Sequence, residues 1–450
     1  MKVQITERVT NYVTRTKWED IPAQGINTAK EAMLDCLGCI LLGATQKPSR
    51  IIIDYLQDIG AKPQATVIGQ KMRTACDLAA LANGIAAHAE DYDDISIAML
   101  GHPSAPIFPA ALAAGEIVKA SGQEIIAAYI IGFEVATRLG LALGFSHYNR
   151  GWHGTATTGT IAAAAASARL LGLDETQTRM ALALAASLTC GLRQNFGTMT
   201  KPWHAGNAAR SGVTAALLVK KGFTADLNIL EAPLGYYQVF RGENSQPLPK
   251  TIENLGETYE IVNSGIALKP YPSCGETHAG IEIMLNLRQE NQLSFTKVNS
   301  IECVFNETMN SVMLHHEPKT GLEGKFSIEY CVARALLDGK VGLEDFTDAR
   351  VNQPEIREII KKVKIQLEPS FPMMTTTIKV TLDDGRILSG NLEKPKGYPE
   401  NPLSHAQVAA KYKDCAQLIL SESAVNRSLA LMENLEKVEN IGQLMQVISG

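Results

Sequence analysis

Two alanine-rich stretches decide the fold: TIAAAAASARLLG at residues 160–172 and MALALAASLTCG at residues 180–191. Alanine and leucine are the strongest helix formers, so both stretches favour helix. Small side chains also let two helices approach closely, which is typical of helices packed in an interior. The two stretches therefore predict a tightly packed helical domain with several fully buried helices.

The same helical character continues on both sides, through about the first 265 residues. Asp174, with Gln177 three residues later, has the pattern of a capping box, and Asn27 is a suitable N-cap for an earlier helix. Apolar residues recur at helical spacing in four further segments. We expect these helices at residues 29–42, 77–90, 109–120 and 124–143.

After about residue 266 the residue pattern changes from helical to strand-like. Here β-branched residues alternate with polar ones, as in strands with one solvated face. Asp384-Gly385 is a strong hairpin signal between two such runs. KPKGYPENPLS (394–404) is a linker, and the tail from His405 returns to helix and is expected to pack on the helical domain. We expect strands at 300–306, 363–367 and 376–382 and helices at 275–289 and 326–337.

These patterns predict a mainly α fold of two domains. The first is all-helical and comprises residues 1–265 plus 403–450, and the second is a smaller α+β domain of residues 266–402. A chain of 450 residues is too long for a single simple core, which agrees with this division.

The composition excludes several classes of function. A formal net charge of -5 gives no general basic surface for nucleic acid. The N-terminus lacks a signal peptide and the apolar runs are too short to span a bilayer, so we expect a cytoplasmic protein with no membrane partner. The eight cysteines have no framework spacing, and Cys36 and Cys39 lie in an apolar helical run where core packing is favoured over redox chemistry.

One stretch concentrates the polar chemistry: NGIAAHAEDYDDISIAMLGHPSAPIFP, residues 83–109. Its acidic and imidazole side chains suit proton transfer or metal binding and are poorly suited to an apolar core. Asp93 and Asp94 could instead cap helices. His88 with Asp91 and Asp93 resembles an oxygen-rich metal ligand set, but no second histidine follows at i+4, so a metal is not expected.

Four later loops each carry a cation or a phenol. Such side chains could meet an anionic ligand, particularly where a helix begins. The alternative, purely structural roles are that each histidine caps a helix, that Tyr330 is a core residue and that Cys274 is a small buried hydrophobe. The loops are residues 146–160 (Tyr148, Arg150, His153), 195–210 (Lys201, His204, Arg210), 269–278 (Lys269, Cys274, His278) and 321–330 (Lys325, Tyr330).

Together these motifs resemble the MmgE/PrpD family, over essentially the whole chain. The resemblance rests on HAEDYDD, GHPSAPIFPAALA, GWHGTATTGTIAAAAA, NFGTMTKPWHAGNAAR, KPYPSCGETH and EGKFSIEYCVARALLDG, which stand in the family's order. The family includes 2-methylcitrate dehydratase, cis-aconitate decarboxylase and iminodisuccinate epimerase. It implies an all-helical domain, a smaller α+β lid domain, a homodimer, and catalysis without metal or cofactor.

The resemblance also implies a pocket for a small anionic polycarboxylate. The positions that match the decarboxylase site are Asp91, His102, His153, Lys201, Lys269 and Tyr330, and we add Cys274, His278 and His204 from the same motifs. Two positions depart from the decarboxylase: its threonine after the acidic motif is Ile95 here, and its second-domain histidine is Cys274, as in dehydratase-like members. The sequence around Tyr148 resembles the epimerase more closely, and the resemblance implies that the matching tyrosine there serves as a base.

The chemistry shared by these reactions can be argued physically. A proton α to a carboxylate is very weakly acidic, so its removal needs a positioned base and cations that stabilise the developing enediolate. Lys201, Lys269 and His153 could bind carboxylates, while Asp91 could orient His102 as the acid or base. We therefore expect a lyase, most simply a dehydratase of the methylcitrate type. An epimerase, a cis-aconitate-type decarboxylase and a non-catalytic binding protein are the alternatives.

Overall fold

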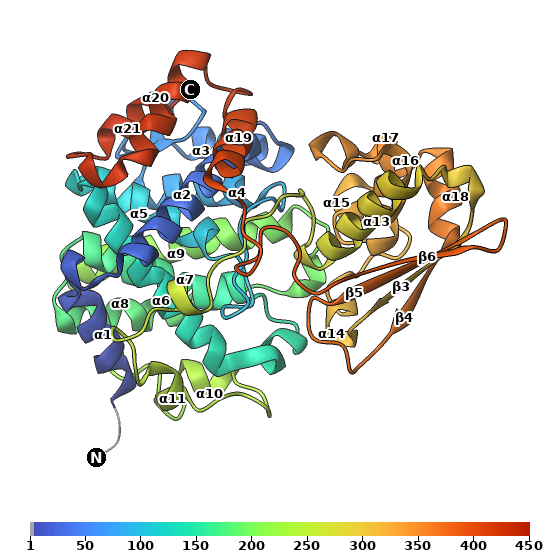
Figure 1. The fold of residues 1–450 in the computed structure, drawn as a ribbon. Helices are drawn as coiled ribbons and strands as arrows, with labels where there is room; N and C mark the ends of the chain where they lie inside the picture. Colours follow the sequence, from blue (N-terminus) through green and yellow to red (C-terminus); the bar gives the residue numbers. More distant parts are fainter. Residues whose placement is uncertain (1–3) are drawn as a thin grey trace. The chain divides into compact units, whose positions relative to one another are not determined.

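The computed structural model describes residues 4–450 and divides the chain into two compact units. The helical unit comprises Met1–Gln194, Met199–Leu268 and Ser404–Gly450, and the mixed unit comprises Asn195–Thr198 and Lys269–Leu403. The mainly α class is confirmed, because helices dominate the described chain and strands are few (Figure 1).

The helical unit is a stack of helices with one short hairpin. Helix α19, the first helix of the C-terminal tail, packs on α2, as expected for the tail. The main elements are α1 Ile5–Arg15, α2 Ala23–Gly43, α3 Lys47–Ile59, β1 Ala65–Val67, β2 Met72–Thr74, α4 Cys76–His88, α5 Ser104–Val118, α6 Gly122–Asn149, α7 Gly154–Leu170, α8 Glu175–Ser187 and α9 Thr200–Lys220. The helices that follow in this unit are α10 Tyr236–Phe240, α11 Leu248–Ile252, α12 Glu260–Asn263, α19 His405–Ala416, α20 Glu422–Glu433 and α21 Gly442–Val447.

Small residues set the spacing of the central helices. A Cβ on Gly206 of α9 would lie 2.4 Å from the Leu81 carbonyl oxygen of α4, and one on Gly212 would lie 2.5 Å from Ala163 Cβ of α7. Nearly every residue of α7 is buried. The alanine-rich stretch at 160–172 is therefore a central helix, and its small side chains let α4, α7 and α9 pack closely.

The mixed unit is built on a four-stranded sheet of order β4-β3-β5-β6, in which β3 pairs parallel with β4 and antiparallel with β5. Helices α13 and α16 pack on each other and α13 packs on β5 and β6, which encloses an apolar core (Figure 1). The elements are α13 His278–Asn291, β3 Val298–Phe305, α14 Glu307–Asn310, α15 Gly321–Gly324, α16 Ile328–Asp338, α17 Asp348–Val351, α18 Pro354–Lys362, β4 Val363–Leu367, β5 Thr376–Leu382 and β6 Ile387–Leu392.

Most local expectations are confirmed. Asp174 and Gln177 form the capping box at α8, and β5 and β6 pair across the Asp384-Gly385 turn. The expected N-cap at Asn27 is wrong, because α2 begins at Ala23 after Pro22. Pro22 has the fixed φ of a helix start and offers no side-chain cap. The true start of α2 therefore lacks the polar N-cap residue by which we located helix starts in the sequence.

All eight cysteines are free thiols, and Cys36 and Cys39 are buried in α2, which confirms core packing for this pair. One helix, α6, is long and apolar enough to cross a membrane by length and composition. Its most apolar window is 94% buried among its neighbours, which accounts for that composition without a bilayer.

Candidate active site

The acidic stretch forms a loop between α4 and α5 in the helical unit. The loop is held at two places by isolated bridges, Ile95 with Ala267 and Ser96 with Gly101. Asp91 adopts φ +52°, a left-handed conformation that costs energy for a residue with a Cβ and is frequent at functional sites. The loop geometry thus fixes an aspartate in a conformation that a free chain would rarely adopt.

Asp91 forms an ion pair with Lys201, the second residue of α9. The ammonium Nζ lies 2.5 Å from Asp91 Oδ1, and both side chains are only 5% exposed. A buried carboxylate needs such a partner, because desolvation without one is costly. The pair therefore holds a positive charge at a defined point in the interior.

His102 lies beside this pair. Its Nδ1–H donates to the Asp94 carbonyl oxygen at 2.9 Å, and Lys201 Nζ lies 3.5 Å from its Nε2. Asp91 Oδ1 is 3.8 Å from the same Nε2. The carbonyl of Asp94 therefore selects the tautomer, and Nε2 of the neutral ring carries the lone pair that a general base requires.

The side chain of Asp94 stabilises the turn that follows His102. Its Oδ1 accepts from the backbone N–H of Ser104 at 3.2 Å, its Oδ2 accepts from the Ser104 hydroxyl, and that hydroxyl lies 2.6 Å from Tyr129 Oη. Burial raises the pKa of the Asp94 carboxyl well above its usual range. Ser104 begins α5, so Asp94 accepts from the first backbone N–H of this helix, although the N-cap residue itself is Pro103.

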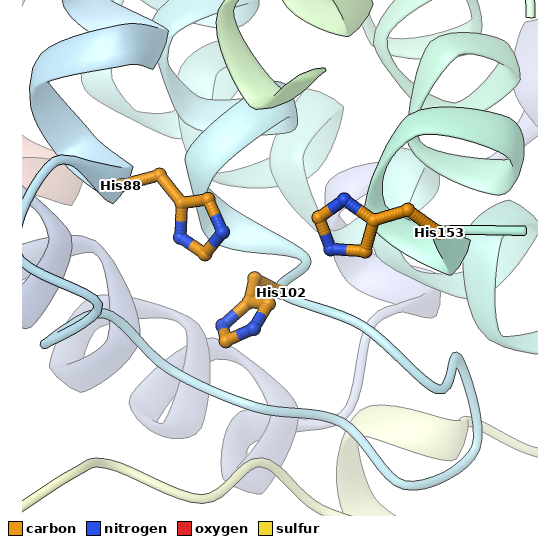
Figure 2. A group of neighbouring side chains, drawn as sticks. All are labelled: His88, His102 and His153. Atoms are coloured by element: carbon orange, nitrogen blue, oxygen red, sulfur yellow. The ribbon is translucent and has the colours of Figure 1, made fainter. Parts of the chain in front are cut away.

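His88, at the end of α4, lies beside His102. Its Nδ1 lies 2.8 Å and 2.9 Å from the two carboxylate oxygens of Asp93, and both side chains have no exposed area. The His88 ring lies 4.3 Å from that of His102 and 5.9 Å from that of His153, centroid to centroid (Figure 2). Burial lowers the pKa of His88 against the opposing charge of Asp93, so the ring is neutral.

His153 and His204 form a second imidazole pair, with their Nδ1 atoms 3.1 Å apart. Burial lowers the pKa of His153 well below its usual range, and burial followed by the charges of His88 and Lys201 lowers the pKa of His204 to about 4. One ring donates and the other accepts, and the accepting ring must be neutral to offer a lone pair.

These donors could in principle hold a metal ion. One nitrogen from each of His88, His102 and His153 lies within 4.8 Å of the others, and His88 and His102 form a similar group with Asp91 and Asp93. However, the ammonium of Lys201 lies against both Asp91 and His102, so a metal ion bound by these two residues would be repelled by a positive charge. The expectation of no metal stays a prediction.

In the mixed unit, two of the expected motifs meet. The backbone N–H of Cys274 donates to the Lys325 carbonyl at 2.9 Å, and Lys325 Nζ donates to the Pro272 carbonyl at 2.9 Å. His278 Nε2 donates to the Ser273 carbonyl at 3.2 Å, and Cys274 Sγ donates to Glu276 Oε2 at 2.8 Å. The KPYPSCGETH and EGKFS segments therefore form one polar turn region, in which Lys269 is also buried.

Tyr330 lies in the apolar core of the mixed unit. Its hydroxyl donates to the Asp345 carbonyl and its ring packs edge-on against Phe346 at 5.7 Å. These contacts are those of the core alternative, so its catalytic role stays a prediction that only the resemblance supports.

Two family models match the chain: the MmgE/PrpD N-terminal domain over residues 7–248 and the MmgE/PrpD C-terminal domain over residues 271–437. The chain belongs to the MmgE/PrpD family. It is similar to cis-aconitate decarboxylase of Homo sapiens, at 28% identity over 463 residues that cover 100% of this chain and 95% of that protein. The decarboxylase of Aspergillus terreus is 26% identical, with 100% and 96% covered.

A second kind of MmgE/PrpD relative is a dehydratase. The 2-methylcitrate dehydratase of Escherichia coli is 25% identical over 391 residues, which cover 82% of this chain and 78% of that protein. The family expected from the sequence motifs is thereby confirmed, and two of the three reaction types named in that expectation, decarboxylation and dehydration, occur among these relatives.

Within this MmgE/PrpD chain, the helical unit brings together five of the expected site residues: Asp91, His102, Lys201, His153 and His204. Tyr148 has other contacts, because its ring packs against the Arg193 guanidinium, whose carbon lies 3.7 Å from the ring centroid. Lys269, Cys274 and His278 lie in the mixed unit.

Sequence reasoning noted His88 and Asp93 but left both outside the expected site. The signal that could have found them is their spacing, with a histidine at the end of a helix and an aspartate five residues later. A chain that turns back after a helix end can bring such residues into contact. Lys411 had no local signal at all: its Nζ donates to the Tyr92 carbonyl at 2.7 Å from a helix 319 residues away.

Proposed function

We propose that this MmgE/PrpD protein is a lyase that removes a proton α to a carboxylate of a small polycarboxylate, by dehydration of a hydroxy-tricarboxylate of the 2-methylcitrate type. The observation that carries the proposal is the placement of the Lys201 ammonium 3.5 Å from Nε2 of His102, the ring nitrogen opposite the one that contacts the Asp94 carbonyl. A base and a cation at one point are what enediolate formation needs.

In this proposal His102 Nε2 takes the α proton while Lys201 faces the carboxylate on which negative charge develops. The buried surroundings strengthen this attraction, because few solvent dipoles screen it. Expulsion of the β-hydroxyl as water then gives an alkene conjugated with the carboxylate. Ile95 and Cys274 support this outcome over decarboxylation, since both depart from the decarboxylase pattern.

Decarboxylation of a cis-aconitate-type substrate is the second candidate. It is favoured by the relatives that align over the whole chain, which are cis-aconitate decarboxylases. Loss of CO₂ from the α,β-unsaturated acid requires the same stabilisation of negative charge, but the proton is then delivered to carbon. Both reactions therefore use His102 and Lys201: His102 accepts a proton in dehydration and donates one in decarboxylation.

The experiment is to incubate the protein with 2-methylcitrate, citrate, cis-aconitate and iminodisuccinate in D₂O and to follow products by NMR and ultraviolet absorbance. Alkene formation from a hydroxy-tricarboxylate supports the proposal. CO₂ release from cis-aconitate without dehydration favours the second candidate. Inversion with solvent deuterium incorporation and no alkene identifies an epimerase instead, and inactivity with tight binding identifies a binding protein.

Two variants link turnover to the site. His102→Asn and Lys201→Met should each lower turnover by about 10²-fold or more, the usual contribution of a positioned acid or base. His405→Asn is the matched control, because His405 also contacts carboxylates, Glu31 at 2.7 Å and Glu433 at 3.1 Å, but is half-exposed. Equal turnover in all three variants would remove His102 and Lys201 from the mechanism.

A further inference from the structure

His88 offers the site a hydrogen-bond acceptor. Its Nδ1 contacts both oxygens of the Asp93 carboxylate, which has no proton to give, so Nδ1 carries the hydrogen. The ring is neutral, because burial lowers its pKa. Its Nε2 therefore presents a lone pair.

This lone pair has no donor from the protein. Within residues 4–450, no hydrogen-bond partner faces His88 Nε2, although the side chain has no exposed area. Figure 2 shows the ring with one nitrogen turned toward the space that it shares with His102 and His153. A buried polar atom left without a partner costs free energy, which is recovered when a ligand supplies that partner.

The chemistry of the ligand follows from this arrangement. The carboxylates of a polycarboxylate at neutral pH are acceptors and cannot bond to an unprotonated imidazole nitrogen. A hydroxyl group can donate to it. Lys201 already supplies the positive charge for a carboxylate, so the cluster holds one group that suits an anion and one that suits a neutral donor.

We infer that His88, held in its tautomer by Asp93, binds a hydroxyl group of the substrate and so selects hydroxy-polycarboxylates over polycarboxylates without one. This inference rests on the proposed function, since it assumes that the cluster is the polycarboxylate site. It adds a specificity-determining residue that stands in the HAEDYDD motif but was left outside the expected site. Asp93 acts through His88 and is a positioning residue.

The test uses two probes that differ in one hydroxyl group: citrate and tricarballylate, its deoxy analogue. Dissociation constants are measured by calorimetry at pH 7.5 on the full chain. The wild-type protein should bind citrate about tenfold more tightly, as expected for one hydrogen bond that satisfies a buried acceptor. This comparison needs no variant and is therefore independent of any folding defect.

Two variants then locate the preference. His88→Phe should weaken the binding of citrate to the level of tricarballylate and leave the affinity for tricarballylate almost unchanged. His147→Phe is the matched control: it removes a buried imidazole outside the cluster, whose nitrogens contact the Phe240 carbonyl and the Thr157 hydroxyl, and it should retain the preference for citrate. Circular dichroism and thermal melting confirm that both variants fold.

The outcomes separate the two proposals. Equal binding of citrate and tricarballylate to the wild-type protein overturns the inference and leaves the proposed function standing. A preference that survives in folded His88→Phe also overturns it. Failure of both probes to bind, even at millimolar concentration, contradicts the proposed function itself.

Discussion

Lys201 Nζ lies 2.5 Å from Asp91 Oδ1, although 110 positions of sequence separate the two residues. The pair joins the start of α9 to the loop after α4, and it brings a positive charge to within 3.5 Å of His102 Nε2. The candidate site is thus an ion pair placed beside the imidazole of His102.

Because Asp91 holds the Lys201 ammonium, the two residues should act as one unit. We expect Asp91→Asn and Lys201→Met each to lower kcat by about 10²-fold, and the double variant to be no worse than Lys201→Met alone. Steady-state kinetics of the three variants check this. Lys340→Met is the control, because it breaks an exposed pair with Glu344 of similar length, 2.7 Å. Losses that add in the double variant would contradict the coupling.

A second buried pair supports the loop between α4 and α5 from the C-terminal tail. Lys411 Nζ lies 2.7 Å from Asp35 Oδ1 and 2.7 Å from the Tyr92 carbonyl oxygen. Lys411→Met leaves the fully buried Asp35 without its charge partner, which should lower the free energy of unfolding by about 3–5 kcal/mol. The additional change Asp35→Asn should recover most of that stability but not turnover, because the Tyr92 carbonyl still lacks its donor. Recovery of both quantities would show that Lys411 does not position the loop.

The contact between α4 and α9 should be intolerant of a single methyl group. In Gly206→Ala the new Cβ meets the Leu81 carbonyl oxygen at 2.4 Å and Ile85 at 2.5 Å, so the helices must separate. We expect a loss of about 1–3 kcal/mol in the free energy of unfolding and lower turnover, since the two helices carry His88 and Lys201. Gly442→Ala is the control, because its nearest neighbour is the flexible Asn440 side chain at 3.0 Å. Equal melting temperatures for both variants would refute the packing argument.

Acid should destabilise the folded protein below pH 6.5. Burial lowers the pKa of His204 to about 4 and the pKa values of His88 and His153 below their usual 6.5. Between these pKa values the unfolded chain binds more protons than the folded one. The contribution of these histidines to the free energy of unfolding is therefore fully present above pH 6.5 and is lost as the pH drops toward 4. Urea denaturation at pH 7.5, 6.5 and 5.5 measures this slope.

His204→Asn should flatten that slope, because it removes one of the groups. His405→Asn should steepen it instead: hydrogen bonds to Glu31 and Glu433 raise the pKa of His405, so the stability that it adds is present at low pH and is lost as the pH rises. Identical slopes in both variants would mean that these histidines do not govern the acid response.

Chelation should leave turnover unchanged. The Lys201 ammonium lies where a metal ion bound by Asp91 and His102 would have to sit, and a second cation there would be repelled. The measurement is turnover after exhaustive dialysis against EDTA, with metal content determined on the same sample. Lost activity that returns on addition of a single divalent metal would disprove this expectation.

The local patterns of the sequence predicted much of the architecture. Alanine-rich helices, alternating strands and the Asp384-Gly385 hairpin all depend on interactions between residues close in sequence, and these are visible in the chain itself. The N-cap at Asn27 was wrong because α2 begins at a proline that gives no polar signal.

The sequence by itself therefore determined the mainly α class and, through its motifs, the MmgE/PrpD family and most of the residues of the candidate site. Only the tertiary structure decided which residues are partners. Asp91 pairs with Lys201, while His102 takes its tautomer from the Asp94 carbonyl and His88 takes its tautomer from Asp93. The physical reason is that hydrogen bonds and buried ion pairs depend on distances of about 3 Å, which spacing along the chain does not specify once a loop intervenes.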